Sequence, residues 1–400
     1  MEKQIIAEQG RNTPVMENCD VLVCGGGVAG VASALAAARN GADVCLVEKG
    51  YVLGGLATIG LITDFLPLCD GEGHQVIGGI PEEFFRLAIQ YGPGSIPECW
   101  QEGGGITQRA QRRLTAKFNP AWFQLALEQL LVKAHVRLMY DTRICAVAKD
   151  GNKVQAVIVE NKSGRGAVTC KALVDATGDA DVCFQAGEAT ESLDSNRRAC
   201  WFYSYSGQKV ELHISGDVFF QPVPEGHSTF SGDDWRSVTA FMIDSRKLVL
   251  GKLEELRQKP ETADATPLLL AAYPQMRKTR RLKSDFELEV YDHRYYEDAI
   301  GMTGYYRNPG LILYIPYRAL KAVNTKNLLA AGRCISCLEP AWNITRGIPS
   351  CSITGQAAGT AAALCVRTGE TVQSLNVELL QNTLREQGAV IDRGYALKQA

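Results

Sequence analysis

The chain has 400 residues, enough for two or three domains, and 46% of them are hydrophobic and 22% charged, as in soluble globular proteins. Its net charge of −2, without a basic cluster, argues against nucleic acid or a membrane as a partner. No uncharged apolar stretch reaches the roughly 18 residues of a membrane span, and the polar amino terminus lacks the core of a secretory signal. We therefore expect a cytoplasmic protein.

The 13 cysteines are odd in number and scattered singly, which favours reduced, buried thiols over a disulfide framework. No histidine stands at ligand spacing from a cysteine or another histidine, so we expect no metal site. The histidines are His74, His135, His213, His227 and His293.

A glycine-rich stretch near the amino terminus organises the first half of the chain. Apolar residues 21–24 predict a buried strand, and Gly25, Gly27 and Gly30 follow at the spacing G-x-G-x-x-G before an alanine-rich helix. Gly25 allows a tight turn, Gly27 lets the backbone approach a pyrophosphate, and Gly30 lets the helix lie close to the sheet. The stretch predicts a diphosphate site at the helix N-terminus, where backbone N–H groups are free.

A second strand over residues 43–47 ends in Glu48, at the position where a carboxylate accepts a ribose hydroxyl. This favours a dinucleotide ligand, although an ordinary strand–turn–helix unit without ligand is the alternative. The following loop contains Gly54 and Gly55, whose lack of a side chain leaves the backbone open to a ligand. We interpret this loop as part of a cofactor site rather than as a simple turn.

The next elements alternate between helical and extended patterns. Helices are expected from Pro81 to about Gly92 and from Pro120 onward. The hydrophobic period then changes to two, which predicts an antiparallel ribbon that rejoins a parallel sheet at Asp175. The predicted strands of this part cover residues 136–140, 144–148, 154–159 and 172–175.

The middle of the chain is richer in aromatic residues, and its clearest element is a long amphipathic helix over residues 235–258. A further strand over residues 327–330 ends at Gly332 and Arg333. A helix of small residues is then expected to begin at Ile353 and to present its positive N-terminal end to an electron-rich ligand. The tail from Ser374 has a helical pattern.

With both ends considered, the chain resembles the bacterial FAD-dependent oxidoreductases, which have the glutathione-reductase type of dinucleotide fold. The resemblance extends over nearly the whole chain and implies FAD as cofactor without specifying a substrate. The motifs that carry it are residues 25–30, 48, 54–55, 78–81, 175–179, 315–318, 329–334 and 355–359.

The resemblance implies an α/β fold: a Rossmann-like FAD-binding domain with a parallel sheet and an antiparallel ribbon, and an inserted mixed α+β substrate domain. The FAD domain is expected at residues 18–62, 120–190 and 325–372. The substrate or cap domain is expected at 63–119 and 191–324, and a helical tail at 373–400.

The resemblance also implies which residues meet FAD, from the diphosphate and adenosine ribose to the flavin pyrimidine, which the helix of Gln356 would face. These cofactor-binding residues are Gly25, Gly27, Val28, Ala29, Gly30, Glu48, Lys49, Gly54, Gly55, Leu56, Ala57, Thr58, Ile144, Ala176, Thr177, Gly178, Gly332, Arg333, Gln356 and Ala357.

The chain departs from the family pattern after Arg333. Family members often carry a histidine there, whereas this segment holds Asn343 and Arg346. We therefore name Arg346, Asn343 and His74 as catalytic candidates; a surface ion pair for Arg346 and a solvated loop position for His74 are the alternatives. Cys334 and Cys337 form a C-x-x-C, which we interpret as two structural thiols rather than a redox pair.

The predicted function is hydride transfer between a small organic substrate and N5 of the flavin, with an unidentified electron donor or acceptor. An NAD(P)H-dependent flavin reductase is the alternative in the same class, disfavoured because only one complete dinucleotide fingerprint is present. A flavin-containing binding or assembly protein without turnover is the alternative from another class. The sequence is also compatible with a homo-oligomer.

Overall fold

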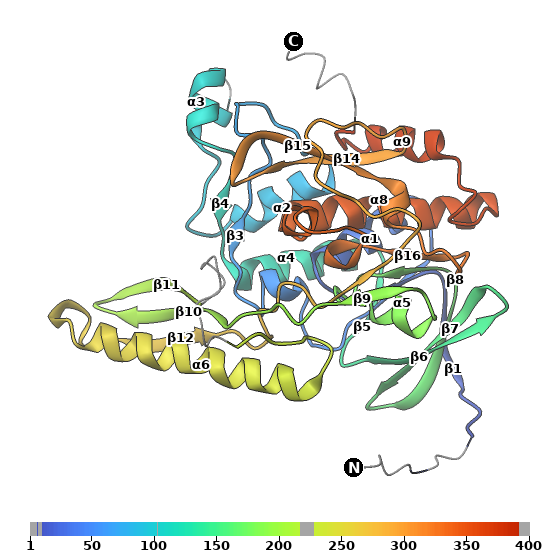
Figure 1. Cartoon of the computed structure of the whole chain (residues 1–400), viewed down its shortest axis with the longest axis horizontal. Helices are drawn as coiled ribbons and strands as arrows, with labels where there is room; N and C mark the ends of the chain where they lie inside the picture. The colour runs from blue at the N-terminus through green and yellow to red at the C-terminus, as the bar shows by residue number, and fades with distance from the viewer. Residues whose placement is uncertain (1–5, 7–9, 102, 217–227, 392–400) are drawn as a thin grey trace.

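The computed structural model describes residue 6 and residues 10–101, 103–216 and 228–391. His227 and the end of the predicted tail, residues 392–400, lie outside the described residues. Within these limits the chain has an α/β architecture in which one mixed sheet carries helices and several small antiparallel sheets (Figure 1).

The central sheet has seven strands in the order β5-β2-β1-β8-β7-β6, with β16 also pairing with β8. β1, β2, β5, β8 and β16 are parallel to one another, whereas β6 and β7 form an antiparallel ribbon with β8. The strands are β1 (Val15–Cys24), β2 (Val44–Val47), β5 (Arg137–Met139), β6 (Arg143–Asp150), β7 (Lys153–Asn161), β8 (Gly164–Asp175) and β16 (Leu328–Ala330).

The long strand β8 joins the ribbon to the parallel sheet. Its first half pairs antiparallel with β7, its last three residues pair parallel with β16, and β1 runs along its other edge. The expected parallel sheet with an antiparallel ribbon is therefore present.

One part of the ribbon prediction was wrong. The segment at residues 136–140 is β5, which pairs parallel with β2 through Leu138 and Leu46 and so belongs to the parallel sheet. A three-residue strand carries too little periodicity to reveal its partner. The helix before it, α4 (Pro120–Lys133), makes the crossover that a parallel connection requires.

Two helices, α1 (Val28–Arg39) and α8 (Ile348–Thr368), cross at very close range beside the sheet. A Cβ atom at Gly355 would lie 2.3 Å from the carbonyl oxygen of Ala29, and one at Gly359 would lie 2.0 Å from that of Ser33. The hydroxyl of Ser33 donates to the Gly355 carbonyl over 3.0 Å. The glycines therefore allow the backbone contact that positions the N-terminus of α1.

Further elements pack on these helices and share their core. In Figure 1 the hairpin β14–β15 lies on the side of α8 away from the central sheet. The additional elements of the molecule are α2 (Ile80–Ile89), α3 (Ile106–Gln111), α5 (Asp181–Gln185), α7 (Ala341–Thr345), α9 (Val377–Glu386), β3 (Asp64–Phe65), β4 (Ala116–Lys117), β9 (Thr190–Ser192), β13 (Arg280–Leu282), β14 (Ala299–Tyr305) and β15 (Asn308–Pro316).

A separate arm extends from this body (Figure 1). It contains the helix α6 (Trp235–Arg257), whose Phe241, Val249 and Leu253 are buried as the amphipathic pattern predicted. Small clusters distinct from the main core hold the arm together. Its strands are β10 (Ala199–Ser206), β11 (Lys209–Gly216) and β12 (Thr266–Leu270). The domain limits given above stay a prediction.

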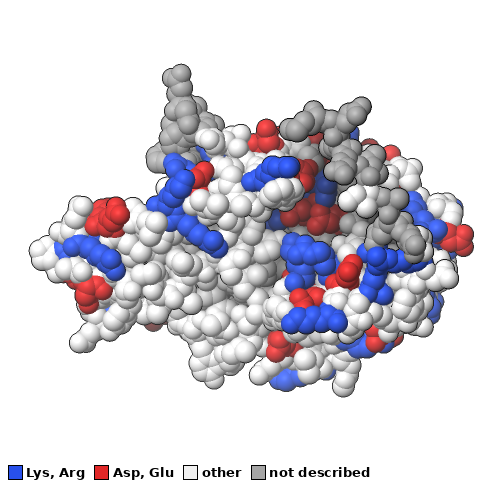
Figure 2. Space-filling model, turned by 90° about the horizontal axis from the view of Figure 1, so that it is seen from below, with Lys and Arg blue, Asp and Glu red and all other residues white. Residues whose placement is uncertain are grey.

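The surface carries no large area of one charge on the face shown in Figure 2, where basic and acidic side chains are interspersed. In the described part of the chain, no helix has both the length and the apolar character needed to cross a membrane.

Candidate functional site

A cavity of about 750 Å³ opens at the carboxyl edge of the parallel strands. Gly25, Glu48, Ala176 and Ala331 line it, and each directly follows a strand of the central sheet, β1, β2, β8 or β16. Ligands of open α/β sheets bind at this edge because the strand ends and helix N-termini meet there.

The three fingerprint glycines have distinct environments. Gly25 has a φ of +105° and a Cβ there would lie 2.5 Å from the Ala176 carbonyl oxygen, while a Cβ at Gly30 would lie 1.8 Å from that of Gly25. Gly27, by contrast, faces open space: a Cβ there would meet no atom within 4 Å. Gly27 is the N-cap of α1 and lines the cavity, so the free N–H groups of the first helical turn face a space that suits a diphosphate.

Glu48 lies at the end of β2 and also lines the cavity. Its two carboxylate oxygens each accept one backbone N–H, from Gly26 and from Gly50, both over 2.7 Å. A carboxylate has about four acceptor positions. Glu48 therefore holds the glycine turn and the following loop together and keeps acceptor capacity for two ribose hydroxyls.

Residues 20–200 and 189–384 match the sequence profile of the family described as FAD dependent oxidoreductase. The chain belongs to this family. It is accordingly an FAD-dependent oxidoreductase, and the cavity fits its cofactor, since Gly27 leaves room for a diphosphate and Glu48 has acceptors for a ribose.

Solved structures are similar to this chain at low sequence identity. A p-nitrophenol 4-monooxygenase from Pseudomonas putida is 12% identical, with 93% of this chain and 85% of that chain covered and a TM-score of 0.50. A geranylgeranyl bacteriochlorophyll reductase-like protein from Thermoplasma acidophilum is 14% identical, with 94% and 84% covered and a TM-score of 0.48. No curated protein matches the chain.

Most residues predicted to bind FAD lie in the cavity wall, although their contacts with the cofactor stay a prediction. This group comprises Gly25, Gly27, Val28, Ala29, Glu48, Lys49, Gly54, Gly55, Leu56, Ala57, Ile144, Ala176, Thr177, Gly178, Gly332 and Arg333. Two catalytic candidates, Asn343 and Arg346, line the same cavity, and the Arg346 Nη2 donates to Asn343 Oδ1 over 3.3 Å.

Several predicted residues support the wall instead of lining it. Gly30 packs against the Gly25 backbone, and the hydroxyl of Thr58 donates to the Leu53 carbonyl over 2.6 Å. His74 is outside the cavity lining, and its Nδ1 lies 2.9 Å from Asp70 Oδ2. The structure therefore does not bring His74 to the candidate FAD site.

Gln356 and Ala357 also lie away from the cavity, where the prediction did not place them. The helix α8 begins at Ile348, with Pro349 in its first turn, so Gln356 lies more than two turns inside the helix. Its Oε1 accepts the Ile80 N–H over 3.0 Å, and both Gln356 and Ala357 are buried away from the cavity. The signal for the earlier start was the proline, which is favoured in a first turn because its missing N–H has no helical partner to lose.

The segment that begins α8 faces the cavity in place of Gln356. Gly347, Ile348 and Cys351 line it, so the N-terminal turn of the helix provides the N–H groups and positive dipole expected there.

The C-x-x-C cysteines do not form a disulfide and do not line the cavity. Both are fully buried, and burial raises the pKa of the Cys337 thiol to about 12. The Cys334 thiol contacts the Ala331 carbonyl oxygen at 3.3 Å. A reactive thiol needs a lowered pKa and access, so these observations favour the structural interpretation.

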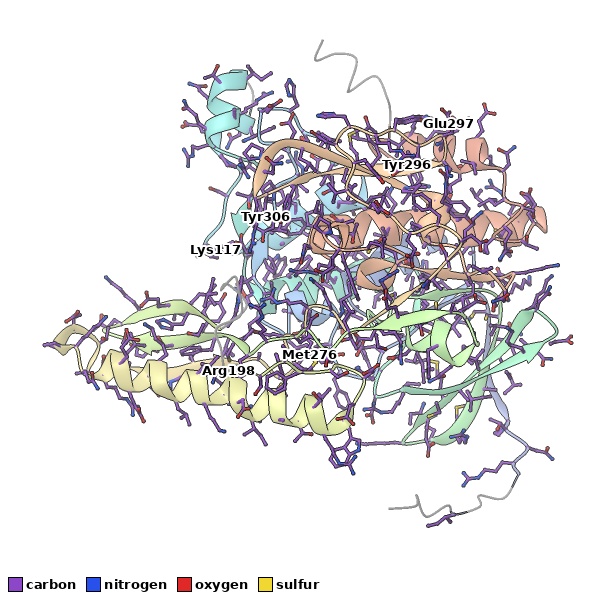
Figure 3. All side chains as sticks on the ribbon, viewed as in Figure 1. Lys117, Arg198, Met276, Tyr296, Glu297 and Tyr306 are labelled. Carbon is purple, nitrogen blue, oxygen red and sulfur yellow. The ribbon has the colours of Figure 1, made fainter. Side chains whose placement is uncertain are left out.

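The cavity wall contains ionisable residues that the sequence did not single out. Asp64 on β3 is one: burial raises the pKa of its carboxyl, only partly opposed by the charge of Lys117, its cross-strand partner on β4. Tyr306, which is labelled in Figure 3, and Arg307 also line the cavity. An acid within the apolar segment after the cofactor loop was the available signal for Asp64.

Arg277 is the second such residue, and its sequence neighbourhood carries no recognisable motif. Burial, followed by the charge of Arg346, lowers the pKa of the Arg277 guanidinium to about 9. Met276, immediately before it, is labelled in Figure 3 where the arm meets the body. Only the folded chain brings Arg277 into the same cavity as Arg346.

Proposed function

We propose that this FAD-dependent oxidoreductase transfers a hydride between a small organic substrate and the flavin. The observation that carries the proposal is a partly buried carboxyl group, Asp64, in the same cavity as the Gly27 and Glu48 features of a nucleotide site. A partly buried carboxyl with a raised pKa beside a cofactor site is a candidate general acid or base.

FAD, when bound, supplies an acceptor or donor for a hydride, which carries two electrons with one proton. In the direction of substrate oxidation, Asp64 would accept the second proton, the one released from a hydroxyl or amine of the substrate. Arg346 would hold the substrate and stabilise negative charge that develops on it. Trp201 and Ile62, which also line the cavity, would help exclude water from the reacting atoms.

An anaerobic reduction experiment tests this proposal. The FAD-loaded protein is mixed with series of alcohols, amines and organic acids, and with NADH and NADPH in parallel. For the reverse reaction, enoates are added to protein whose flavin has first been reduced, and the return of flavin absorbance is recorded. We expect the visible flavin absorbance to be lost with at least one organic compound and to be retained with both pyridine nucleotides. Reduction by a pyridine nucleotide alone would contradict the proposal and favour a flavin reductase.

A further inference from the structure

Arg277 and Arg346 lie in the cavity wall, and neither has a carboxylate partner among the described residues. Neighbouring cations are matched with acids, because Arg333 pairs with Asp179 at 2.8 Å and Lys278 pairs with Glu339. Asp179 and Glu339 are thus already engaged by other cations. Arg277 and Arg346 leave an uncompensated positive charge in this part of the cavity.

The hydrogen-bonding capacity of these two arginines is also incomplete. In the described part of the chain, the Nε atoms of Arg277 and Arg346 are both buried and have no hydrogen-bond partner. The ring of Trp201 lies 5.9 Å from the Arg277 Cζ, and among the described residues the head group of Arg346 has a hydrogen bond to Asn343 over 3.3 Å. Buried donors without acceptors are costly, so a ligand with acceptor oxygens would relieve this cost.

The two guanidinium groups also act on each other. After burial, the charge of Arg346 is the main cause of the lowered pKa of Arg277, and burial lowers the pKa of Arg346 as well. Two like charges held in partly dehydrated surroundings repel, and an anion between them would turn repulsion into attraction on both sides.

The backbone holds Arg277 in place before any ligand arrives. The buried Asn196 accepts the N–H groups of Arg277 and Lys278 through Oδ1, over 2.7 and 3.0 Å. Arg346 follows α7 and directly precedes the N-cap of α8, so its position depends on a rigid helix junction. Preorganised donors lose less conformational entropy when a ligand binds.

We infer that Arg277 and Arg346 together bind a carboxylate group of the substrate, so that the substrate is a small organic acid. A planar carboxylate matches the planar fork of a guanidinium, and the apolar Ile62 and Trp201 in the same wall suit the organic remainder. The cofactor diphosphate already has a separate site at Gly27 and α1. This inference rests on the proposed function, because it names the substrate class for the same cavity.

A ligand titration tests the inference on the FAD-loaded protein. Acetate, succinate and benzoate are added, with acetamide and benzamide as uncharged matches, while flavin absorbance and tryptophan fluorescence are recorded. We expect at least one carboxylate to bind saturably and at least about 10-fold more tightly than its amide. Arg277→Met and Arg346→Met should each weaken that carboxylate about 10- to 100-fold, as for loss of a charged hydrogen-bond partner, and should keep FAD.

The controls separate the possible causes. Arg86→Met removes the same charge from an exposed position on α2 and should leave the affinity unchanged, and Trp201→Phe identifies the fluorescence signal that comes from the cavity. Equal binding of carboxylates and amides, or tighter binding of inorganic phosphate than of every carboxylate, would overturn the inference. Loss of FAD from both arginine variants would assign the pair to the cofactor.

The outcomes distinguish this inference from the proposed function. Carboxylate binding that depends on Arg277, without reduction of the flavin by any organic compound, would contradict hydride transfer and leave the anion site intact. Reduction by neutral alcohols or amines alone, without carboxylate binding, would support hydride transfer and contradict the anion site.

Discussion

Glu48 is predicted to serve both the fold and the ligand. Its carboxylate ties the backbone of Gly26 to that of Gly50 and lines the cavity at the end of β2. Glu48→Ala should therefore weaken FAD by about 1.5–3 kcal/mol, the range for hydrogen bonds to a charged group. Titration of the apoprotein with FAD measures this change. Glu160→Ala, on the exposed ribbon, is the matched control, and an unchanged affinity in Glu48→Ala would move the ribose contact elsewhere.

Arg346 is predicted to act on the substrate rather than on the cofactor. Lysine keeps the positive charge but loses the planar fork that can hold two oxygens. Arg346→Lys should therefore retain FAD and lose about 10²-fold in turnover, comparable to removal of one preorganised donor. Steady-state kinetics and flavin content check both parts. Near-normal turnover, or loss of FAD, would disprove the assignment.

We expect Asp64 to make the activity depend on pH. Burial raises the pKa of its carboxyl above the ordinary value, and in the proposed substrate oxidation its ionised form would be the base. Activity should therefore rise with pH through this raised pKa, and Asp64→Asn should remove that limb and lower turnover by about 10²- to 10⁴-fold. A pH–rate profile of both proteins is the measurement. An unchanged profile in the variant would exclude Asp64 as the proton carrier.

The raised pKa of Asp64 also predicts how folding stability changes with pH. A carboxyl with a raised pKa binds its proton more tightly in the folded than in the unfolded chain, so folding stability falls as pH rises through that pKa. Asp64→Asn removes this loss and should unfold at higher urea concentration than the parent protein at neutral pH. A change in activity without this gain would point to a different role for Asp64.

At the scale of elements, the crossing of α1 and α8 positions the cofactor site. A Cβ at Gly359 would lie 2.0 Å from the Ser33 backbone oxygen, so Gly359→Ala must separate the two helices. Overpacking costs typically about 1–3 kcal/mol, more than the roughly 1 kcal/mol that alanine gains in helix propensity. We expect lower unfolding stability and weaker FAD binding in this variant.

Gly251→Ala is the matched control for that prediction. Gly251 is exposed on α6, and a Cβ there would meet nothing within 4 Å, so only the helix propensity changes. This variant should be stabilised by up to about 1 kcal/mol in urea unfolding. Equal effects of the two substitutions would show that α1 and α8 are not in the close contact described.

Local patterns predicted the elements with strong signals and failed where tertiary contacts decide. The glycine fingerprint, the capped helix α4 and the long helix α6 were predicted from their own residues. The partner of β5 was not, because three residues cannot specify which strand they pair with. The prediction followed the run of small residues and placed the start of α8 at Ile353. The helix instead begins at Ile348, with Pro349 in its first turn.

In the candidate site, too, some residues could be predicted from the sequence and others could not. Residues predicted to bind through the backbone, such as Gly27, follow a motif, and the sequence could place them in the cavity wall. The place of Arg277 in the cavity depends on residues far away in the chain, so no local pattern identifies it, whereas the signal for Asp64 was an acid within an apolar segment. His74 had the chemistry of a catalyst, but its loop lies outside the cavity wall.

At the scale of the whole molecule, the segments that line the cavity come from both ends of the chain and from the arm. Gly27 and Glu48 belong to the amino-terminal part, Trp201 to the arm, and Arg333 and Arg346 to the carboxyl-terminal part. One cofactor that contacts all of these segments should stabilise the folded chain as a unit, by an amount set by its concentration relative to Kd.

The central claim is that this cavity holds FAD tightly and without a covalent bond. The most direct measurement is to denature the purified protein, separate it from small molecules and identify and quantify the released yellow compound. We expect one FAD released per chain and a protein that regains FAD after refolding. A colourless protein that takes up no flavin on reconstitution, or flavin that stays attached to the denatured chain, would contradict it.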